Sequence, residues 1–216
     1  YADSITLRLM VQHRSGIPNF TNSAEFWSDA PENKKSNLDY ALAMPTSFAP
    51  DEGYEYSNTN YLLLREIIAK VTGRSHEQFI QKNILTPLGL DNTFFSLNDV
   101  DDINNVMSGY YVGVDEDFKT AEYGMLATAE DVGLFLRALN DGSVFTNAAE
   151  QAIYQDIYVY EHGGLLPGYQ SLAEYHKDID TVVVQFMNTT DFNGYEWNLS
   201  EISINRIVKI VEKQIN

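Results

Sequence analysis

Hydrophobic residues recur at helical spacing in five segments of the chain. The clearest segment spans residues 58–73, where Asn58 and Thr59 precede a stripe of leucine, isoleucine and valine, and Gly73 follows. A polar capping residue, an apolar face and a terminal glycine are the start, body and stop signals of an amphipathic helix. The same signals predict four further helices, over residues 6–13, 75–85 and 128–142 and from Ser200 onward.

Capping pairs mark the start of two of these helices. Ser75 and Gln78 have the spacing of a capping box, and the Thr-Pro pair at residues 86–87 marks the predicted end of that helix. Thr128 and Asp131 open the next helix in the same way. Each of these helices therefore has a start that is encoded locally.

Strand signals gather late in the chain. Three segments rich in β-branched and aromatic residues predict strands, at residues 157–160, 169–176 and 181–187. The short polar segment 177–180 between the last two predicts a hairpin turn. The last third of the chain is therefore expected to be an antiparallel meander followed by a helix.

This order of elements predicts an α+β chain. Helix and loop dominate the first two-thirds, whereas a parallel doubly wound sheet would alternate strands with helices. We expect two parts on this basis: residues 1–150 form a helical subdomain, and residues 151–216 supply sheet strands and a terminal helix of an α/β subdomain.

Composition excludes several classes of protein. The 216 residues include 44% hydrophobic and 12% aromatic side chains, enough for a packed core and too many for a disordered chain. Cysteine is absent, so there is no disulfide scaffold. The formal net charge of −17 repels phosphate and argues against a nucleic-acid partner. No apolar run reaches the roughly 20 residues of a membrane span.

Common catalytic signatures are absent as well. His76-Glu77 begins like a zinc-protease helix, but residue 80 is isoleucine where the second histidine is required. There is no G-x-S-x-G elbow and no nucleotide-binding glycine loop. The four histidines show no ligand spacing, so we expect no metal. We expect no organic cofactor either.

Two short segments stand out, YEYSNTN at residues 54–60 and HGGLLPGY at residues 162–169. Taken singly, the first is typical of a polar loop that caps a helix, and the second of a glycine-rich turn that enters a strand. Their order along the chain resembles the serine β-lactamase and penicillin-binding-protein superfamily, in its branch of class C β-lactamase-like hydrolases, DD-peptidases and esterases. The matching motifs are Tyr56-Ser57-Asn58, on a loop of the helical region, and His162-Gly163-Gly164, on the strand that borders the active site.

The resemblance covers nearly the whole chain. Segments 5–20, 54–73, 84–95, 123–142 and 162–171 all match family landmarks in family order. It implies a β-lactamase/DD-peptidase-like fold, an antiparallel sheet flanked by helices plus a helical subdomain. It also implies hydrolysis through a serine ester, in which the serine needs a base and the acyl-enzyme oxygen needs hydrogen-bond donors.

The resemblance assigns a role to each motif residue. Tyr56 takes up and returns the proton or belongs to that relay, and Asn58 holds substrate or the neighbouring lysine. His162 occupies a position where many relatives have lysine. Histidine is only partly charged at neutral pH, so a carboxylate-bearing β-lactam is less assured as the substrate.

The residues after His162 border the expected substrate. Gly163 and Gly164 leave room for it along the strand, and the backbone N–H of Leu165 is expected to donate to the oxyanion.

The chain departs from the family at the nucleophile, which lies in a Ser-x-x-Lys motif. The residues three before its lysines are Pro31, Glu32, Ile67, Phe79, Glu116, Glu174, Arg206 and Ile210, and none of them is serine. In the family this motif precedes the segment with which this sequence opens, and the chain begins Tyr1-Ala2-Asp3 without methionine. We therefore expect the chain to lack its N-terminal part, with the nucleophile helix and the first sheet strands.

Three hypotheses follow. In the first, the chain is the C-terminal portion of a serine hydrolase acting on a peptide, amide, ester or β-lactam bond. In the second, it is a truncated, catalytically inactive relative that serves as a binding or interaction protein. In the third, an unrelated helical domain carries the motifs by chance.

The first two hypotheses imply different partners. The hydrolase acts on a small-molecule or peptidoglycan-type substrate in the bacterial envelope or medium, with β-lactamase, DD-carboxypeptidase, D-amino-acid amidase and esterase activities all open. In either case, the absent N-terminal segment or another chain is expected to complete the open edge of the sheet.

Overall fold

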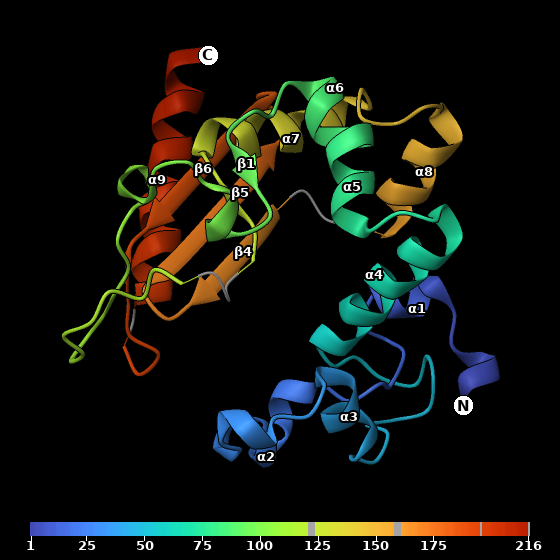
Figure 1. The fold of residues 1–216 in the computed structure, drawn as a ribbon. Coiled ribbons are helices and arrows are strands. Elements are labelled where there is room, and N and C mark those ends of the chain that lie inside the picture. The colour runs from blue at the N-terminus through green and yellow to red at the C-terminus, as the bar shows by residue number, and fades with distance from the viewer. Residues whose placement is uncertain (121–123, 158–160, 195, 216) are drawn as a thin grey trace. The chain divides into compact units, whose positions relative to one another are not determined.

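The computed structural model describes residues 1–120, 124–157, 161–194 and 196–215 (Figure 1). Contacts divide the chain into a first unit, mainly residues 1–81, and a second unit, mainly residues 82–155 and 161–215. We describe each unit by itself. The division at residue 150 that the sequence suggested stays a prediction.

The first unit is helical and is built around one long helix, α4. Its helices are α1 (Leu7–Val11), α2 (Ala24–Ser28), α3 (Asn37–Leu42), α4 (Asn58–Thr72) and α5 (His76–Ile80). Helices α1, α3 and α5 all contact α4. As predicted, α4 ends at Gly73, whose φ of 67° places it in the left-handed region that glycine tolerates. Ser57, rather than Asn58, occupies the N-cap position.

The helix predicted over residues 75–85 extends further than its sequence signals suggested. The capping box between Ser75 and Gln78 is confirmed. After α5 the chain continues through a π-helical turn, Gln81–Leu85, and a short helix α6, Thr86–Leu88. The predicted stop at residues 86–87 is therefore wrong. Pro87 lies in the first turn of α6, where its missing N–H costs no intrahelical hydrogen bond.

A three-stranded antiparallel sheet forms the centre of the second unit. Its strands are β4 (Glu161–Leu166), β5 (Tyr169–His176) and β6 (Thr181–Met187), in the order β4-β5-β6. The predictions of β5, β6 and the turn between them are confirmed. The strand predicted over residues 157–160 is wrong at Ile157, the last residue of helix α8 (Ala148–Ile157), while residues 158–160 lie outside the described part of the chain. Ile153 and Ile157 continue the helical spacing of α8, and this outweighs the strand propensity of isoleucine.

Two helices cover opposite faces of this sheet, α7 (Ala129–Asp141) and α9 (Glu196–Ile215) (Figure 1). Val183 packs in a buried cluster with Leu172 of β5 and with residues of α9. Its neighbour Val184 faces Gly133 of α7, since a Cβ built at Gly133 lies 3.8 Å from Val184 Cγ2. Consecutive residues of a strand point to opposite faces, so the two helices sandwich the sheet. Helix α9 begins four residues before the predicted start at Ser200.

Two short strand pairs attach the connecting segments of this unit. Strand β1 (Thr93–Phe94) pairs with β3 (Leu126–Ala127) antiparallel, and β2 (Tyr110–Tyr111) pairs with β7 (Thr189–Thr190) parallel. The buried Thr190 hydroxyl accepts a hydrogen bond from Gly168 N at 2.7 Å and donates to Leu166 O at 3.2 Å. Strand β7 therefore holds the turn that joins β4 to β5.

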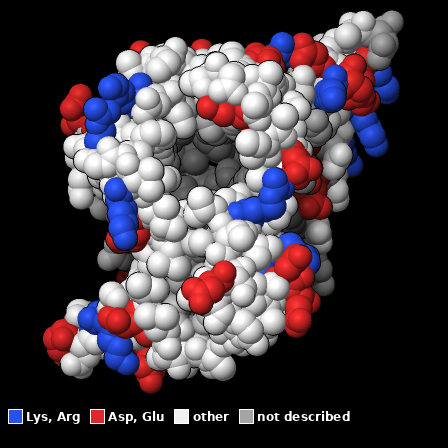
Figure 2. All heavy atoms as spheres, turned by 90° about the vertical axis from the view of Figure 1, so that its right-hand side faces the viewer, with Lys and Arg blue, Asp and Glu red and all other residues white. Residues whose placement is uncertain are grey.

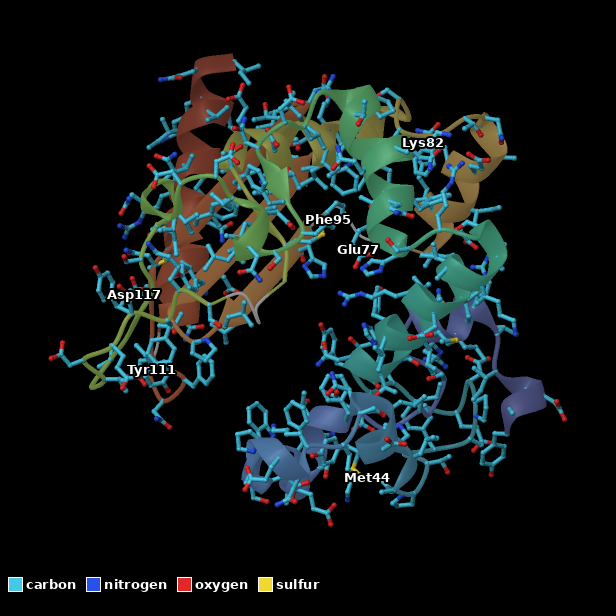
Figure 3. The ribbon with its side chains drawn as sticks, viewed as in Figure 1. Met44, Glu77, Lys82, Phe95, Tyr111 and Asp117 are labelled. Atoms are coloured by element: carbon cyan, nitrogen blue, oxygen red, sulfur yellow. The ribbon has the colours of Figure 1, made fainter. Side chains whose placement is uncertain are left out.

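The segment around β2 is closed by Asp117, labelled with Tyr111 in Figure 3. Asp117 Oδ1 accepts hydrogen bonds from the backbone N–H groups of Gly109 and Lys119, both at 3.0 Å. The Ser108 hydroxyl first, and then these two amides, hold the pKa of the Asp117 carboxyl below its usual value. The carboxylate therefore stabilises this loop near neutral pH.

Candidate active site

Tyr56-Ser57-Asn58 forms the entry to helix α4 in the first unit. The Tyr56 side chain is 53% exposed, whereas Ser57, Thr59 and Asn60 are each at most 1% exposed. An accessible phenol thus lies beside the buried polar side chains of Ser57, Thr59 and Asn60. Such a segment keeps its position when most of its polar groups are hydrogen-bonded.

Segment 15–20 supplies many of those hydrogen bonds, while the buried Ser57 Oγ and Asn60 Nδ2 have no hydrogen-bond partner among the described residues. Asn19 Oδ1 accepts from Asn58 N at 3.2 Å and from Asn58 Nδ2 at 3.4 Å. The Thr59 hydroxyl donates to Pro18 O at 2.7 Å and accepts from Phe20 N at 3.0 Å. One amide proton of Asn58 is therefore used in holding the loop.

A buried pair extends the same network by one residue. The Ser15 hydroxyl donates to Asn60 Oδ1 at 2.6 Å and accepts from Ile17 N at 3.1 Å. Both side chains are at most 2% exposed, so this bond is shielded from competing water. The first turn of α4 and segment 15–20 therefore form one rigid polar cluster.

The tyrosines around Tyr56 have different chemical capacities. The Tyr61 hydroxyl donates to Val11 O at 3.2 Å. Burial raises the pKa of Tyr61 above its usual value, and the neighbouring phenols of Tyr56 and Tyr54 raise it further. Tyr61 is thereby held as a neutral donor to the backbone at Val11, the last residue of α1, whereas Tyr56 is the more exposed of the two phenols.

Sequence reasoning missed His13, whose ring lies among these tyrosines. Its ring centroid is 4.4 Å from that of Tyr56 and 5.3 Å from that of Tyr61. In the sequence, the four histidines show no spacing typical of metal ligands. The available signal was the position of His13 at the end of the helix predicted over residues 6–13, within a segment that already resembled a family landmark.

The second motif lies on strand β4 of the second unit, as the resemblance implied. His162 is opposite Ala173 of β5, and Gly164 is opposite Ser171. Among the described strands β4 pairs with β5 alone, so its other edge is open. A Cβ at Gly164 would lie 2.6 Å from Ser171 Oγ, which is closer than side chains tolerate. Glycine at this position therefore keeps the strand in register without displacing Ser171.

Leu165 continues this strand opposite Gln170, and its side chain is exposed. The predicted site residues thus fall into two sets, Tyr56 and Asn58 in the first unit and residues 162–165 in the second. Their roles stay predictions. Among the residues described, no three His, Asp or Glu side chains gather as metal ligands would.

A family model described as Beta-lactamase matches residues 1–157 of the chain. The chain belongs to the beta-lactamase family. Membership confirms the resemblance seen in the sequence motifs.

Curated relatives from this family match part of the chain. Penicillin-binding protein 4* of Bacillus subtilis is 34% identical over 93 residues, which is 41% of this chain and 21% of that protein. A putative D-alanyl-D-alanine carboxypeptidase of Escherichia coli K12 is 29% identical over 96 residues, which is 42% of this chain and 22% of that protein. The chain therefore spans about a fifth of the length of these relatives.

Solved structures share the fold. The D-amino acid amidase of Ochrobactrum anthropi SV3, complexed with L-phenylalanine amide, aligns with 100% of this chain and 73% of its own, with a TM-score of 0.82 and 22% identity. A penicillin binding protein of Bacillus halodurans aligns with 94% of this chain and 75% of its own, with a TM-score of 0.73 and 17% identity. The predicted α+β, β-lactamase-like fold is confirmed.

Proposed function

We propose that the chain is the C-terminal portion of a serine hydrolase that cleaves an amide or peptide bond through an acyl-enzyme. The observation that carries this proposal is the state of Tyr56. Its phenol is exposed, while Glu55 N donates to His13 O on one side of it and Asn58 N donates to Asn19 Oδ1 on the other. A proton-transfer group has to be accessible and fixed in place at the same time, and this arrangement provides both.

The chemistry requires a nucleophile that these 216 residues do not encode in Ser-x-x-Lys form. We propose that such a segment precedes residue 1 in the full-length protein. Its serine Oγ attacks the carbonyl carbon while its proton passes to Tyr56, and the relay then protonates the leaving nitrogen. Free tyrosine ionises near pH ~10, so a cation beside Tyr56 is needed, and the motif lysine is the proposed source.

Strand β4 is proposed to hold the substrate. An extended substrate can pair with the open edge of β4, and the backbone N–H of Leu165 is the proposed donor to the oxyanion. Gly163 and Gly164 place no side chain in its path. The Asn58 carboxamide, oriented by Asn19, is proposed to bind the substrate amide or the lysine.

An uncharged amide is the proposed substrate class. A lysine at position 162 would carry a full charge for a substrate carboxylate, whereas histidine is only partly charged at neutral pH. The fold likeness to a D-amino acid amidase supports a small amide. The relatives named as a penicillin-binding protein and a D-alanyl-D-alanine carboxypeptidase support a peptidoglycan-type peptide in the bacterial envelope as the second candidate. Along the described part of the chain, no helix has the length and apolar character to cross a bilayer.

The experiment uses the full-length protein with a panel of D-phenylalanine amide, L-phenylalanine amide, a D-alanyl-D-alanine peptide, an aryl ester and a chromogenic cephalosporin. We expect labelling by a fluorophosphonate and the highest kcat/KM for an amide. Tyr56→Phe should lower kcat by about 10²–10⁴-fold, because the proton relay is lost. Tyr54→Phe is the matched control and should change kcat little.

Two results would overturn this proposal. One is a full-length protein that neither labels nor hydrolyses any member of the panel. The other is a Tyr56→Phe variant with unchanged turnover, which would remove Tyr56 from the relay.

A binding protein is the second candidate, and the open edge of β4 favours it. The same edge that could hold a substrate could accept a strand from a partner chain. Failure of labelling together with saturable binding of an extended peptide would favour this candidate over the hydrolase.

A further inference from the structure

His13 contacts the chain on both sides of Tyr56. Its backbone oxygen accepts a hydrogen bond from Glu55 N at 3.0 Å, and its ring Nδ1 accepts one from Ser57 N at 3.1 Å. Its ring also lies against the Tyr56 ring, with centroids 4.4 Å apart and planes 33° apart. A single residue therefore holds the residue before the tyrosine, the residue after it, and the tyrosine ring itself.

We propose that His13 is the positioning residue of Tyr56, and that it acts as a neutral hydrogen-bond acceptor. This inference rests on the proposed function, in which Tyr56 transfers the proton. His13 itself touches no reacting atom in this proposal. It sets the place and the orientation of the phenol from which the proton moves.

The backbone of His13 limits what can replace it. Its φ of 57° lies in the left-handed region, which asparagine and histidine enter more readily than most side chains. This turn follows α1 directly and brings the ring to the entry of α4. An alanine here would be strained, so asparagine and glycine are the informative substitutions.

The hydrogen bond at Nδ1 also defines the protonation state of the ring. A ring nitrogen that accepts from an amide N–H carries no proton, so the proton of neutral His13 lies on Nε2. When His13 becomes charged, Nδ1–H faces the Ser57 N–H and the hydrogen bond is lost. The hold on Tyr56 is therefore expected to weaken as His13 takes up a proton.

The surroundings of the ring are mostly phenolic. Tyr61 of α4 lies at 5.3 Å and Tyr54 at 6.1 Å between centroids, in addition to Tyr56. Of the nearby charged groups, Arg14 pairs with Asp51 at 2.8 Å, and the Glu55 carboxylate accepts from Asn22 at 3.0 Å. Arg14 and Glu55 are each bonded to another residue, and the Ser57 amide donates to Nδ1.

The experiment compares His13→Asn and His13→Gly in the full-length protein. Asparagine keeps the left-handed backbone and places Oδ1 near the position of Nδ1, but it removes the ring. Glycine keeps the backbone and removes both the ring and the side-chain acceptor. We expect kcat to fall about 10–100-fold in His13→Gly with little change in KM, because the phenol is misplaced. His13→Asn should recover part of this loss.

Three further readouts separate positioning from general stability. The wild-type kcat should fall on the acid side as His13 becomes charged, whereas His13→Asn should lack that acid limb because its acceptor does not titrate. In a Tyr56→Phe background, His13→Gly should cause little further loss, since it acts through Tyr56. Hydrogen exchange of the Ser57 amide should be faster in His13→Gly than in wild type and intermediate in His13→Asn.

The outcomes distinguish this inference from the proposed function. If the wild-type protein is active and Tyr56→Phe is not, but His13→Gly keeps wild-type kcat, the inference is overturned and the function stands. If the wild-type protein has no activity, the proposed function fails. Hydrogen exchange of the Ser57 amide is then the measurement that tests the inference about His13. Unchanged exchange in His13→Gly overturns the inference, and accelerated exchange supports His13 as the residue that holds the Tyr56 segment.

Discussion

Asp131 is a buried carboxylate in the first turn of α7. It is 4% exposed, and its Oδ2 accepts hydrogen bonds from Asn92 N at 2.9 Å and from the Thr93 hydroxyl at 2.8 Å. Its own N–H donates to the Thr128 hydroxyl at 3.2 Å, which is the predicted cap. One residue therefore joins the helix start to strand β1, more than 30 residues earlier in the chain.

Removal of this carboxylate should destabilise the protein. Asp131→Ala leaves the Asn92 amide and the Thr93 hydroxyl without their acceptor, and an unsatisfied buried donor costs about 1–3 kcal/mol. We expect a loss of that size in the free energy of unfolding, measured by urea denaturation. Glu130→Ala, at an exposed position of the same turn, is the control and should change it by less than about 0.5 kcal/mol. Equal effects of the two variants would contradict the role of Asp131.

At the scale of elements, the β5–β6 hairpin is fastened to helix α7 through Asp180. Arg137 of α7 donates to the Asp180 carboxylate and, at 3.1 Å, to Asp180 O. The Tyr175 hydroxyl donates to Asp180 Oδ1 at 2.7 Å. The Tyr175 hydroxyl first, and then Arg137, lower the pKa of Asp180 below its usual value. The turn is thus held by a charge-dependent contact.

This contact should make part of the stability depend on pH. Because the pKa of Asp180 is lower in the folded state, its contribution is present above the usual aspartate range and is lost as pH falls through the folded-state pKa. Asparagine tolerates the φ of 48° found at residue 180. Asp180→Asn should therefore lower the urea midpoint at pH 7 without straining the backbone. The difference from wild type should shrink toward pH 3.

The matched control for this change is Asp178→Asn, at an exposed position of the same turn. It removes the same charge without touching Arg137 or Tyr175, so its midpoint should stay near that of wild type. If the difference in urea midpoint between wild type and Asp180→Asn grows as pH falls, the proposed contact is contradicted.

At the scale of the whole molecule, a net charge of −17 acts on a surface with few cations. On the face shown in Figure 2, basic and acidic side chains of the described residues are interspersed among uncharged ones. Ion pairs such as Arg8–Asp156 and Lys35–Glu25 are largely exposed and contribute little. Repulsion between the excess carboxylates is therefore the main long-range electrostatic effect.

Salt should accordingly raise the thermal midpoint at neutral pH. Raising sodium chloride from about 20 mM to about 500 mM shortens the screening length to a few ångströms and reduces this repulsion. We expect a higher midpoint in differential scanning calorimetry. Near the isoelectric point of about 4.4, where the net charge is close to zero, the same change should have little effect. A midpoint that falls with salt at neutral pH would contradict this prediction.

Local sequence signals determined most of the secondary structure. The capping pair Thr128–Asp131, the glycine after α4 and the hydrophobic runs of β5 and β6 all act within a few residues, so the sequence sufficed to predict them. Where local signals compete, the prediction was wrong. Pro87 suggested a stop that a helix start tolerates, and Ile157 suited either a strand or the end of α8.

The sequence by itself also determined the family, because the Tyr56 and His162 motifs occur in the family's order within a chain that resembles it throughout. Only the tertiary structure decided how Tyr56 is held. His13 bonds Ser57 and Asn19 bonds Asn58, each across about 40 residues of chain, and hydrogen bonds over such separations leave no periodic trace in a sequence. These hydrogen bonds depend on where the chain after α1 places the His13 ring and the Asn19 carboxamide, and packing decides that position.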